Sequence, residues 1–204
     1  MSCKVGIVDY GAGNIRSVYN AIRNIDKEPV LITLPENIKS CDKVILPGVG
    51  AFQNAMDVLK SNEMDKALNE YVKSGKLLLG ICLGMQLMCL DSKEDGHHEG
   101  LGYIEGHVVP FQQKEGFKIP HMGWNAIYKA KDDPLLDDIS DNSDVYFVHS
   151  FYVDCHDTSD RLLISKHSNE FVSGFSKDNL YGLQFHPEKS QSVGIKLLEN
   201  FIAV

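Results

Sequence analysis

The sequence predicts an α/β protein with a central, mostly parallel sheet that is covered by helices on both faces. In the first half of the chain, short apolar runs rich in Val, Ile and Leu alternate with segments of helical periodicity. The runs are apolar throughout, which is typical of parallel strands buried on both faces. In the second half, short β-type runs follow one another and are separated by turn residues. They indicate antiparallel strands added to the same sheet or packed beside it.

The elements of the first half are assigned in order from the apolar pattern. Strands are expected over residues 4–10, 29–33, 43–50 and 76–81. The helix expected over residues 14–25 has its apolar residues on one face, namely Ile15, Val18, Ile22 and Ile25. A longer helical pattern over residues 51–75 is expected to break near Ser61 and Asn62 and to end at Gly75. A further helix is expected over residues 82–90.

The second half is predicted to consist of strands and a final helix. The β-type runs cover residues 102–111, 124–130, 144–153, 161–167, 170–176 and 180–186. Residues 91–100 are polar and are the most loop-like stretch, and residues 192–204 form the expected last helix. At 204 residues the chain is long enough for one sizeable core and short for two, so residues 1–204 are expected to form a single domain.

Charge and cysteine usage narrow the function classes. The formal net charge of −8 argues against a nucleic-acid partner. The apolar runs are too short for a membrane span, and the N-terminus lacks the features of a signal peptide. Five cysteines at irregular spacing, with no CxxC pair, indicate neither a disulfide framework nor a zinc site. We therefore expect a reduced, cytoplasmic protein, and the sequence indicates no metal and no cofactor.

Cys82 lies in the sequence GICLG, between a predicted strand and a predicted helix. The G-x-C-x-G spacing is that of a nucleophile elbow with cysteine in place of serine. Gly80 and Gly84 would let the tight turn pack against its neighbours, and the helix N-terminus would favour the thiolate form of a nucleophile. The alternative is a buried cysteine at an ordinary strand–helix junction.

A thiolate nucleophile needs a base, and His186 is the best candidate among the eight histidines. It ends a predicted strand and is followed by Pro187 and Glu188. Residues two apart in extended chain point to the same side, so the carboxylate could orient the imidazole as in a catalytic triad. The alternative is a capped strand end with a surface Glu.

Residues 46–52, LPGVGAF, follow the third predicted strand and could supply oxyanion donors. Gly48 and Gly50 free the backbone to turn its amides toward the neighbouring strand end. The amide of Leu83, next to the nucleophile, could be the second donor. The alternative is a tight strand–helix loop, and a phosphate-binding loop is disfavoured because no Lys-Ser/Thr pair follows.

These motifs together resemble the class I glutamine amidotransferases, a family of Cys-His-Glu glutaminases on a flavodoxin-like α/β fold. More narrowly, six motifs in order resemble the amidotransferase subunits of imidazole glycerol phosphate synthases: VDYGAGNIRSV, LPGVGAF, GICLGMQLM, IPHMGWN, YFVHSFY and LQFHPEKS. The resemblance runs from the first strand to the last helix. It implies that Cys82 attacks glutamine, that His186 transfers the proton and that Glu188 orients His186.

The resemblance also implies roles for residues around the nucleophile. Gly48, Val49 and Gly50 match the oxyanion strand of the family, and Leu83 matches its fixed donor. The positions that match the glutamine-binding residues of the family are Gln86, Glu94, His149, Ser150 and Phe151. The expected partner is a (β/α)8-barrel cyclase that takes the ammonia in histidine biosynthesis, and the positions expected near that subunit are Asn14, Trp124, Tyr146 and Lys189.

Three other functions remain open on the sequence alone. A paralogue of this subunit that supplies ammonia for amidating a bacterial surface sugar would share nearly the same motifs. A non-catalytic binding module on the same fold would not need the triad residues, all of which are present. A thiol peptidase or isomerase on a related fold would not show glutaminase activity.

Overall fold

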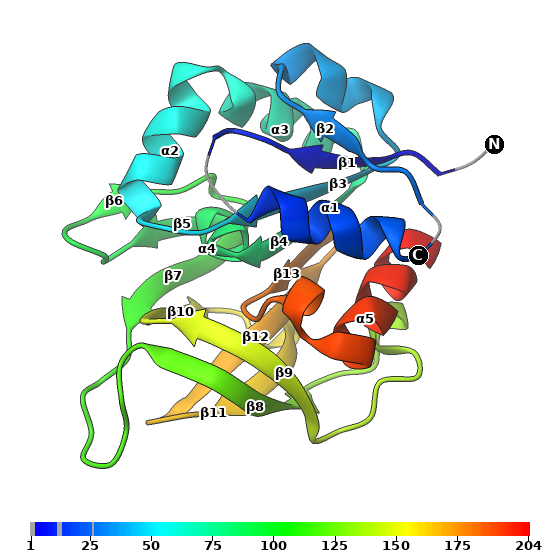
Figure 1. Cartoon of the computed structure of the whole chain (residues 1–204). Coiled ribbons are helices and arrows are strands. Elements are labelled where there is room, and N and C mark those ends of the chain that lie inside the picture. The colour runs from blue at the N-terminus through cyan, green and yellow to red at the C-terminus, as the bar shows by residue number, and fades with distance from the viewer. Residues whose placement is uncertain (1–2, 12–13, 26) are drawn as a thin grey trace.

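A 13-stranded sheet runs through the computed structural model, which describes residues 3–11, 14–25 and 27–204. Five parallel strands form its first part in the order β2-β1-β3-β4-β13 (Figure 1). They are β1 (Val5–Val8), β2 (Val30–Ile32), β3 (Lys43–Gly48), β4 (Leu77–Cys82) and β13 (Leu180–Leu183). β1, β3, β4 and β13 are almost wholly buried apolar runs, as the sequence predicts for a parallel sheet, whereas the edge strand β2 is buried only at Ile32.

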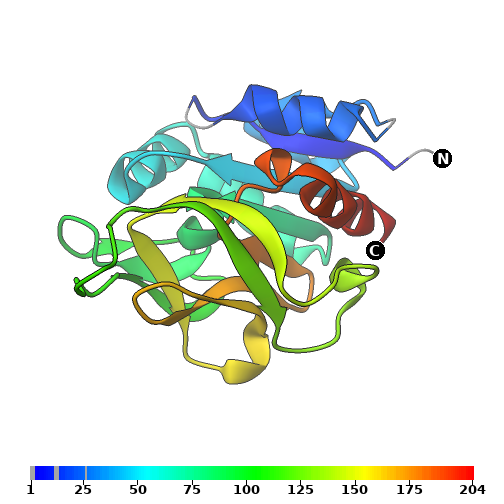
Figure 2. The ribbon, with the colours of Figure 1, turned by 60° about the horizontal axis from the view of Figure 1, so that its bottom comes forward.

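The remaining strands extend the sheet, mainly with antiparallel pairs. The main path continues β12-β10-β7-β5-β6, and β11, β8 and β9 branch from β12. Figure 2 shows this part curving away from the parallel strands. The strands are β5 (Cys89–Ser92), β6 (His98–Glu99), β7 (Ile104–Pro110), β8 (His121–Lys129), β9 (Ser143–His149), β10 (Phe151–Cys155), β11 (Arg161–Lys166) and β12 (Glu170–Lys177). The predicted α/β class with added antiparallel strands is confirmed.

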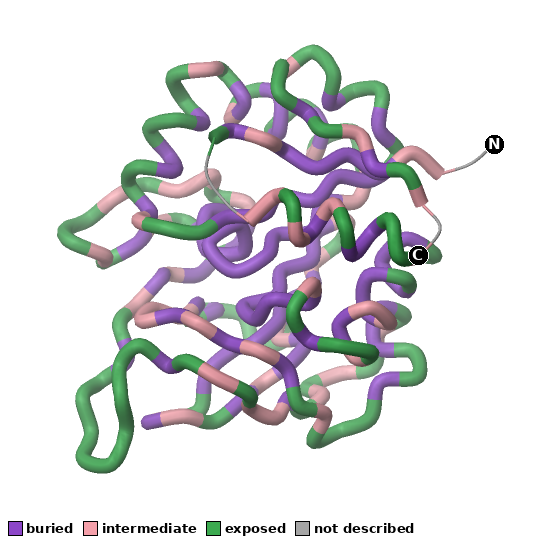
Figure 3. The backbone as a smooth tube through the Cα atoms, viewed as in Figure 1, coloured by how far each residue is buried: buried purple, intermediate pink, exposed green. Residues whose placement is uncertain are grey.

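Helices cover both faces of the parallel strands. Alternate residues of a strand therefore point into two separate buried clusters, one on each face. Residues of α1 (Ile15–Arg23) and α5 (Gln191–Ala203) share one cluster with Ile7 and Ile45. Residues of α2 (Phe52–Ser61), α3 (Met64–Lys73) and α4 (Leu83–Leu87) share the other with Val8 and Val44. Figure 3 shows the buried chain concentrated along these strands.

The chain end is fixed to the sheet by a buried lysine. The amine of Lys43, on β3, lies 2.9 Å from the carbonyl oxygen of Phe201 and 2.7 Å from that of Ile202. These carbonyls end α5 and have no partner within the helix, so the ammonium group caps the helix C-terminus. Burial lowers the pKa of Lys43 from its usual value.

Most predicted elements are present, with four differences. The expected helix over residues 82–90 ends at Leu87, because the carbonyls of Leu87 and Met88 accept hydrogen bonds from Leu101 and Tyr103 instead. The expected loop at 91–100 contains part of β5 and all of β6, which pair as a hairpin. The run 144–153 divides into β9 and β10, and the last strand ends at Leu183.

Three further points concern helices and turns. The break in the 51–75 helix is confirmed and lies at Asn62 and Glu63, where Glu63 has a left-handed φ of 58°. A 3-10 helix at Pro35–Ser40 was not predicted. The expected motif between the first strand and α1 includes residues 12–13, which lie outside the described residues.

Candidate active site

The carboxyl ends of β3, β4 and β13 lie side by side and bring the three predicted catalytic segments together. Gly48 at the end of β3 is the register partner of Cys82 at the end of β4. On the other side of β4, Ile81 pairs with Leu183, three residues before His186. A parallel sheet collects groups from distant parts of the sequence at one edge in this way.

Cys82 occupies a strained turn between β4 and α4. Its φ of 54° and ψ of −112° lie outside the conformations that a side chain ordinarily allows, and the next residue begins the helix. A Cβ at Gly80 would lie 2.7 Å from the carbonyl oxygen of Gly84, and a Cβ at Gly84 would overlap the carbonyl of Leu46. The two glycines therefore permit the close packing that the elbow requires, as expected from the sequence.

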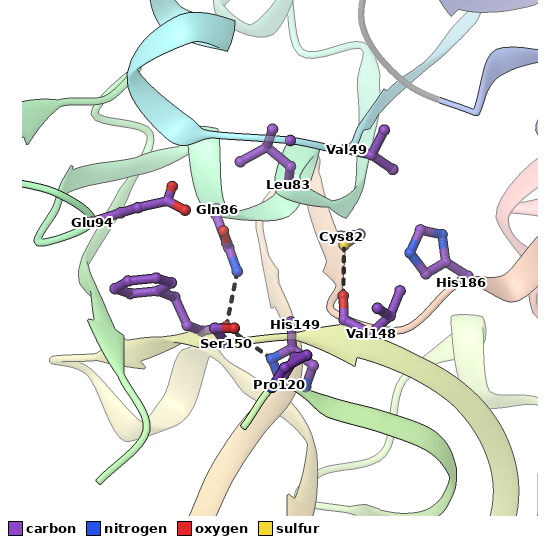
Figure 4. A pocket seen from close by; sticks show the side chains of 12 residues that line it. Val49, Cys82, Leu83, Gln86, Glu94, Pro120, Val148, His149, Ser150 and His186 are labelled. Atoms are coloured by element: carbon purple, nitrogen blue, oxygen red, sulfur yellow. Dashed lines mark hydrogen bonds between the residues drawn. The ribbon is translucent and has the colours of Figure 1, made fainter. Parts of the chain in front are cut away.

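His186 and Glu188 form a buried pair beside this cysteine. Nδ1 of His186 lies 2.8 Å from Oε1 of Glu188, and the two side chains are 2% and 1% exposed. Because the carboxylate only accepts, Nδ1 carries a hydrogen and Nε2 is the atom left for other chemistry. Among the described residues Nε2 has no hydrogen-bond partner, and Figure 4 shows the ring beside the thiol.

The environment of His186 favours its charged form. Burial favours the neutral ring, but interactions with the thiol of Cys82 and with the carboxylate of Glu188 outweigh it and raise the pKa of His186 to about 9. The backbone around the ring is held by Ser190, whose hydroxyl donates to the carbonyl of His186 at 2.6 Å and accepts from the amide of Tyr146 at 3.0 Å. The site can therefore hold a charged imidazolium beside Cys82.

The thiol opens into a cavity of about 280 Å³. The residues that line it come from the end of β4, helix α4, the loop after β3, the β5–β6 hairpin, the position before β8, the turn between β9 and β10 and the segment after β13 (Figure 4). They are Val49, Gly50, Cys82, Leu83, Gln86, Glu94, Pro120, Val148, His149, Ser150, Phe151 and His186. Eight of the nine residues expected to bind substrate are in this set, and the ninth, Gly48, lies behind the wall against Tyr10 and Leu83.

Sequence reasoning missed Pro120 and Val148, which complete the cavity wall. Both lie within the motifs IPHMGWN and YFVHSFY, so their position in those motifs is the signal that could have indicated them. The carbonyl oxygen of Val148 lies 4.0 Å from Sγ of Cys82 and accepts from the thiol.

Polar groups in the cavity are fixed by the surrounding structure. The carboxylate of Glu94 accepts from the amide of Phe52 at 2.7 Å. Nε2 of Gln86 donates to the carbonyl of Phe151 at 3.0 Å, and the same carbonyl accepts from Nδ1 of His149 at 2.8 Å. Burial lowers the pKa of His149 to about 3, so this ring is neutral near pH 7.

The loop after β3 has the backbone freedom expected of an oxyanion strand. Gly50 has a φ of 104°, which side-chain-bearing residues rarely adopt, and Val49 is 41% exposed. The amide of Leu83 lies at the first position of α4, where no helical carbonyl is available to it. Amides from both segments are therefore placed near the cysteine.

The residues expected near a partner lie next to the site. The rings of Trp124 and Tyr146 are 6.0 Å apart in an edge-to-face arrangement, and the amine of Lys189 lies 5.7 Å from the centre of the Tyr146 ring. Trp124 is 49% exposed. Asn14 lines a narrow crevice that also touches His186 and Glu188.

The described residues hold neither a metal-ligand cluster nor a membrane-spanning helix. Within residues 3–11, 14–25 and 27–204, no three His, Cys, Asp or Glu side chains are grouped to bind a metal ion. In the same part of the chain, no helix combines the length and the apolar character that crossing a bilayer requires.

Comparison with known proteins identifies the class to which this fold and site belong. The profile of the family "Glutamine amidotransferase class-I" matches residues 6–204, so the chain belongs to the class I glutamine amidotransferases. Within the family it is similar to the imidazole glycerol phosphate synthase subunit HisH 2 of Methanococcus maripaludis, with 47% identity over 97% of this chain and 98% of that protein. The subunit HisH of Sulfurimonas denitrificans is 46% identical over 97% and 96% of the two chains. The structure of PurLQS from Thermotoga maritima has the same fold, with a TM-score of 0.79 over 100% and 99% of the chains at 20% identity.

Proposed function

We propose that this chain is the glutaminase subunit of an imidazole glycerol phosphate synthase. It hydrolyses glutamine to glutamate and ammonia, and it passes the ammonia to a cyclase subunit with a (β/α)8 barrel in histidine biosynthesis. The observation that carries the activity is the buried His186–Glu188 pair beside Cys82 at the base of a cavity. The similarity to HisH subunits over nearly the whole chain supports the choice of pathway.

The proposed reaction has two halves that use the same groups. The thiolate of Cys82 attacks the side-chain amide carbon of glutamine, and the amide oxygen becomes an oxyanion. The intermediate collapses when the imidazolium of His186 gives its proton to the amide nitrogen, which leaves as ammonia. His186, now neutral, takes a proton from water as the water attacks the thioester. The bond between the carbonyl carbon and the sulfur of Cys82 then breaks, so glutamate leaves and the thiolate of Cys82 is regenerated.

The oxyanion is proposed to receive hydrogen bonds from the amide of Leu83 and from the segment Gly48–Gly50. The amide of Leu83 is fixed by the start of α4. Gly50 gives the second segment its freedom to rotate a peptide, because its φ of 104° has no side-chain penalty. Amide donors aimed at a developing negative charge account for a large share of the rate enhancement in acyl transfer.

The rest of the cavity suits the amino-acid part of glutamine. Glu94 supplies a carboxylate for the substrate ammonium group, and one of its oxygens is already occupied by the amide of Phe52. Gln86 uses its nitrogen in hydrogen bonds to the protein, so its oxygen is available to the substrate. We propose that Ser150 and the backbone of residues 149–151 complete the binding site.

The partner is proposed to dock over the face formed by Asn14, Trp124, Tyr146 and Lys189. This face combines the exposed ring of Trp124, the half-buried ring of Tyr146 and a lysine, a composition that suits a protein interface. We further propose that residues 1–204 act as one amidotransferase domain. The five cysteines are all free, which supports a reducing compartment such as the cytoplasm.

The function is tested by measuring glutamate release with and without a purified imidazole glycerol phosphate cyclase. Glutamine-dependent product formation by the mixture is the expected result, and absence of glutaminase activity with every cyclase tested would reject the proposal. Growth of a histidine auxotroph that lacks its own amidotransferase subunit separates the histidine pathway from the surface-sugar alternative. Rescue supports the first, and failure to rescue by an active glutaminase supports the second.

A further inference from the structure

Gln184 is a fully buried amide that lies against the sulfur of Cys82. It is 0% exposed and sits between the end of β13 and His186. Its backbone amide donates to the carbonyl of Ser173 at 3.0 Å, which fixes the residue against β12. Its Nε2 lies 3.9 Å from Sγ of Cys82. The reaction described above gives this side chain no role.

The orientation of the Gln184 amide follows from its neighbours. The carbonyl of Phe151 can only accept, so the atom of Gln86 that lies 3.0 Å from it must be Nε2. That nitrogen gives its second hydrogen to Oε1 of Gln184, also at 3.0 Å. A flipped Gln184 would place two NH₂ groups against each other. Nε2 of Gln184 is therefore the atom that faces Cys82.

The carbonyl of Phe151 is itself held by a second chain of hydrogen bonds. It accepts from Nδ1 of His149, whose Nε2 lies 2.9 Å from Nδ1 of His121. Nε2 of His121 in turn lies 3.1 Å from Nδ2 of Asn125, which also donates to a backbone carbonyl. The acceptor that orients Gln86 and Gln184 is thus fixed from both sides.

We propose that Gln184 is a fixed, uncharged hydrogen-bond donor to the sulfur of Cys82 that stabilises its thiolate form. This inference rests on the proposed function, in which Cys82 is the nucleophile.

Besides His186, the sulfur has two uncharged polar neighbours, and they favour opposite states. The carbonyl of Val148, at 4.0 Å, can only accept and so favours the protonated thiol. The amide of Gln184, at 3.9 Å, can donate and so favours the thiolate. Because Gln184 carries no charge, it adds a donor without competing with the ion pair between Cys82 and His186.

The test is the pH dependence of alkylation of Cys82 by iodoacetamide, without glutamine, in the full chain. Peptide mass spectrometry separates Cys82 from the other four cysteines. Gln184→Met keeps the length of the side chain and removes the donor. Gln184→Glu keeps an acceptor for Gln86 and places a carboxylate oxygen toward the sulfur. We expect the pH midpoint of alkylation to rise by about one unit in Gln184→Met and by more in Gln184→Glu, which is about a tenfold slower reaction below the midpoint.

The matched control is Ser165→Ala. It removes the buried 2.9 Å hydrogen bond to Ser173, on the strand that supports Gln184, without touching Cys82. Its alkylation profile should coincide with that of the wild type. Unshifted midpoints in folded Gln184 variants would overturn the proposal, even if their glutaminase activity falls. If Gln184→Met does not fold, the side-chain ¹⁵N titration of the wild type decides.

A second measurement needs no substitution at Gln184. The side-chain ¹⁵N resonance of Gln184 should show a step at the pH midpoint of Cys82 alkylation, and this step should be absent in Cys82→Ala. A resonance without that step in the wild type would also overturn the proposal. Neither experiment uses glutamine. An inactive chain with shifted midpoints would therefore reject only the glutaminase function, and an active chain with unshifted midpoints would reject only the role of Gln184.

Discussion

The carboxylate of Glu94 accepts a hydrogen bond from the backbone amide of Phe52 at 2.7 Å, and this bond connects the substrate cavity to the first turn of α2. Helix α2 begins at Phe52, two residues after Gly50. The carboxylate proposed to bind the substrate ammonium group therefore also holds the far end of the proposed oxyanion strand. The side chain of Glu94 would thus act both in substrate binding and in fixing the conformation of that strand.

The first prediction concerns activation by the partner. We expect the isolated chain to be a poor glutaminase, and the cyclase with its ribulosyl phosphate ligand to raise the rate by about 10²–10³, the effect of one oxyanion donor. Gly50→Pro should remove this response, because proline fixes φ near −65° and cannot adopt the described value of 104°. Glutamate release is measured for the chain alone, with the cyclase, and with the cyclase and its ligand.

The control for that substitution is Gly116→Pro. Gly116 also has a positive φ, of 85°, but lies in an exposed loop with no neighbour within 4 Å of an added Cβ. It should respond to the partner as the wild type does. Equal glutaminase rates of the wild type in all three conditions would contradict the prediction.

Cys82→Ala should abolish glutamine hydrolysis while the fold and the partner binding remain. The substitution removes one sulfur at the edge of a cavity and, among contacts to the backbone, only the long 4.0 Å contact to the carbonyl of Val148. Synthesis by the complex should continue when an ammonium salt replaces glutamine. Cys89→Ala is the control, since Cys89 is buried in β5 and burial raises its pKa well above the usual value. If the Cys82→Ala variant keeps an appreciable glutaminase rate, another group is the nucleophile.

Substitutions of the other triad residues should differ in severity. His186→Asn should cost nearly as much activity as Cys82→Ala, because groups that act as a unit are lost together. Glu188→Gln should cost less, since it keeps a partner for Nδ1 of His186 at the same position. In Glu188→Gln the pKa of His186 should fall below about 9, because one of the groups that raise it is gone. Histidine NMR titration and glutaminase kinetics measure these effects, and a reversed order of the two variants would refute the assigned roles.

Acid should destabilise the protein through the His121–His149 pair. Burial lowers the pKa of His149 to about 3 and that of His121 to about 4, whereas both rings titrate near 6.5 in the unfolded chain. Between about pH 6.5 and 3 these rings are protonated in the unfolded state but largely neutral in the folded state. The unfolded state therefore binds more protons, so the free energy of unfolding decreases as the pH falls. Urea unfolding of wild type and His149→Gln at about pH 7 and pH 5 tests this, and the variant should lose less stability between the two. Equal losses of unfolding free energy in the wild type and in His149→Gln would show that these rings do not cause the acid sensitivity.

Lys43→Met should lower the free energy of unfolding by about 1–3 kcal/mol, the cost of leaving buried carbonyls without a partner. The amine of Lys43 holds the carbonyls of Phe201 and Ile202 at the end of α5. Lys166→Met is the control, because the amine of Lys166 is exposed and lies 4.0 Å from Glu170. Urea denaturation that gives the same stability for both variants would disprove the capping role.

Local pattern was sufficient to predict where the main strands lie along the chain, because continuous apolar runs such as β3 and β4 leave little ambiguity about burial. The elbow around Cys82 was predictable because its two glycines have a steric reason that the sequence displays. The early end of α4 was not predictable, since it depends on hydrogen bonds from residues 101–104, which are distant in the sequence. Gln184 and Val148 were missed for the same reason. Their relation to Cys82 exists only once β13 and β9 have reached the end of β4.

The arrangement of the three strand ends has a consequence during synthesis of the chain. Cys82 leaves the ribosome well before β13, His186 and Glu188, which follow it by about 100 residues. β4 can pair with β3 early, but its pairing with β13 requires that the distant β13 has been made. Contacts of such high sequence separation form slowly. A nascent or truncated chain that ends before β13 has the proposed nucleophile but lacks the proposed base, so we expect it not to hydrolyse glutamine. Incomplete copies of this protein would then leave the glutamine pool of the cell untouched.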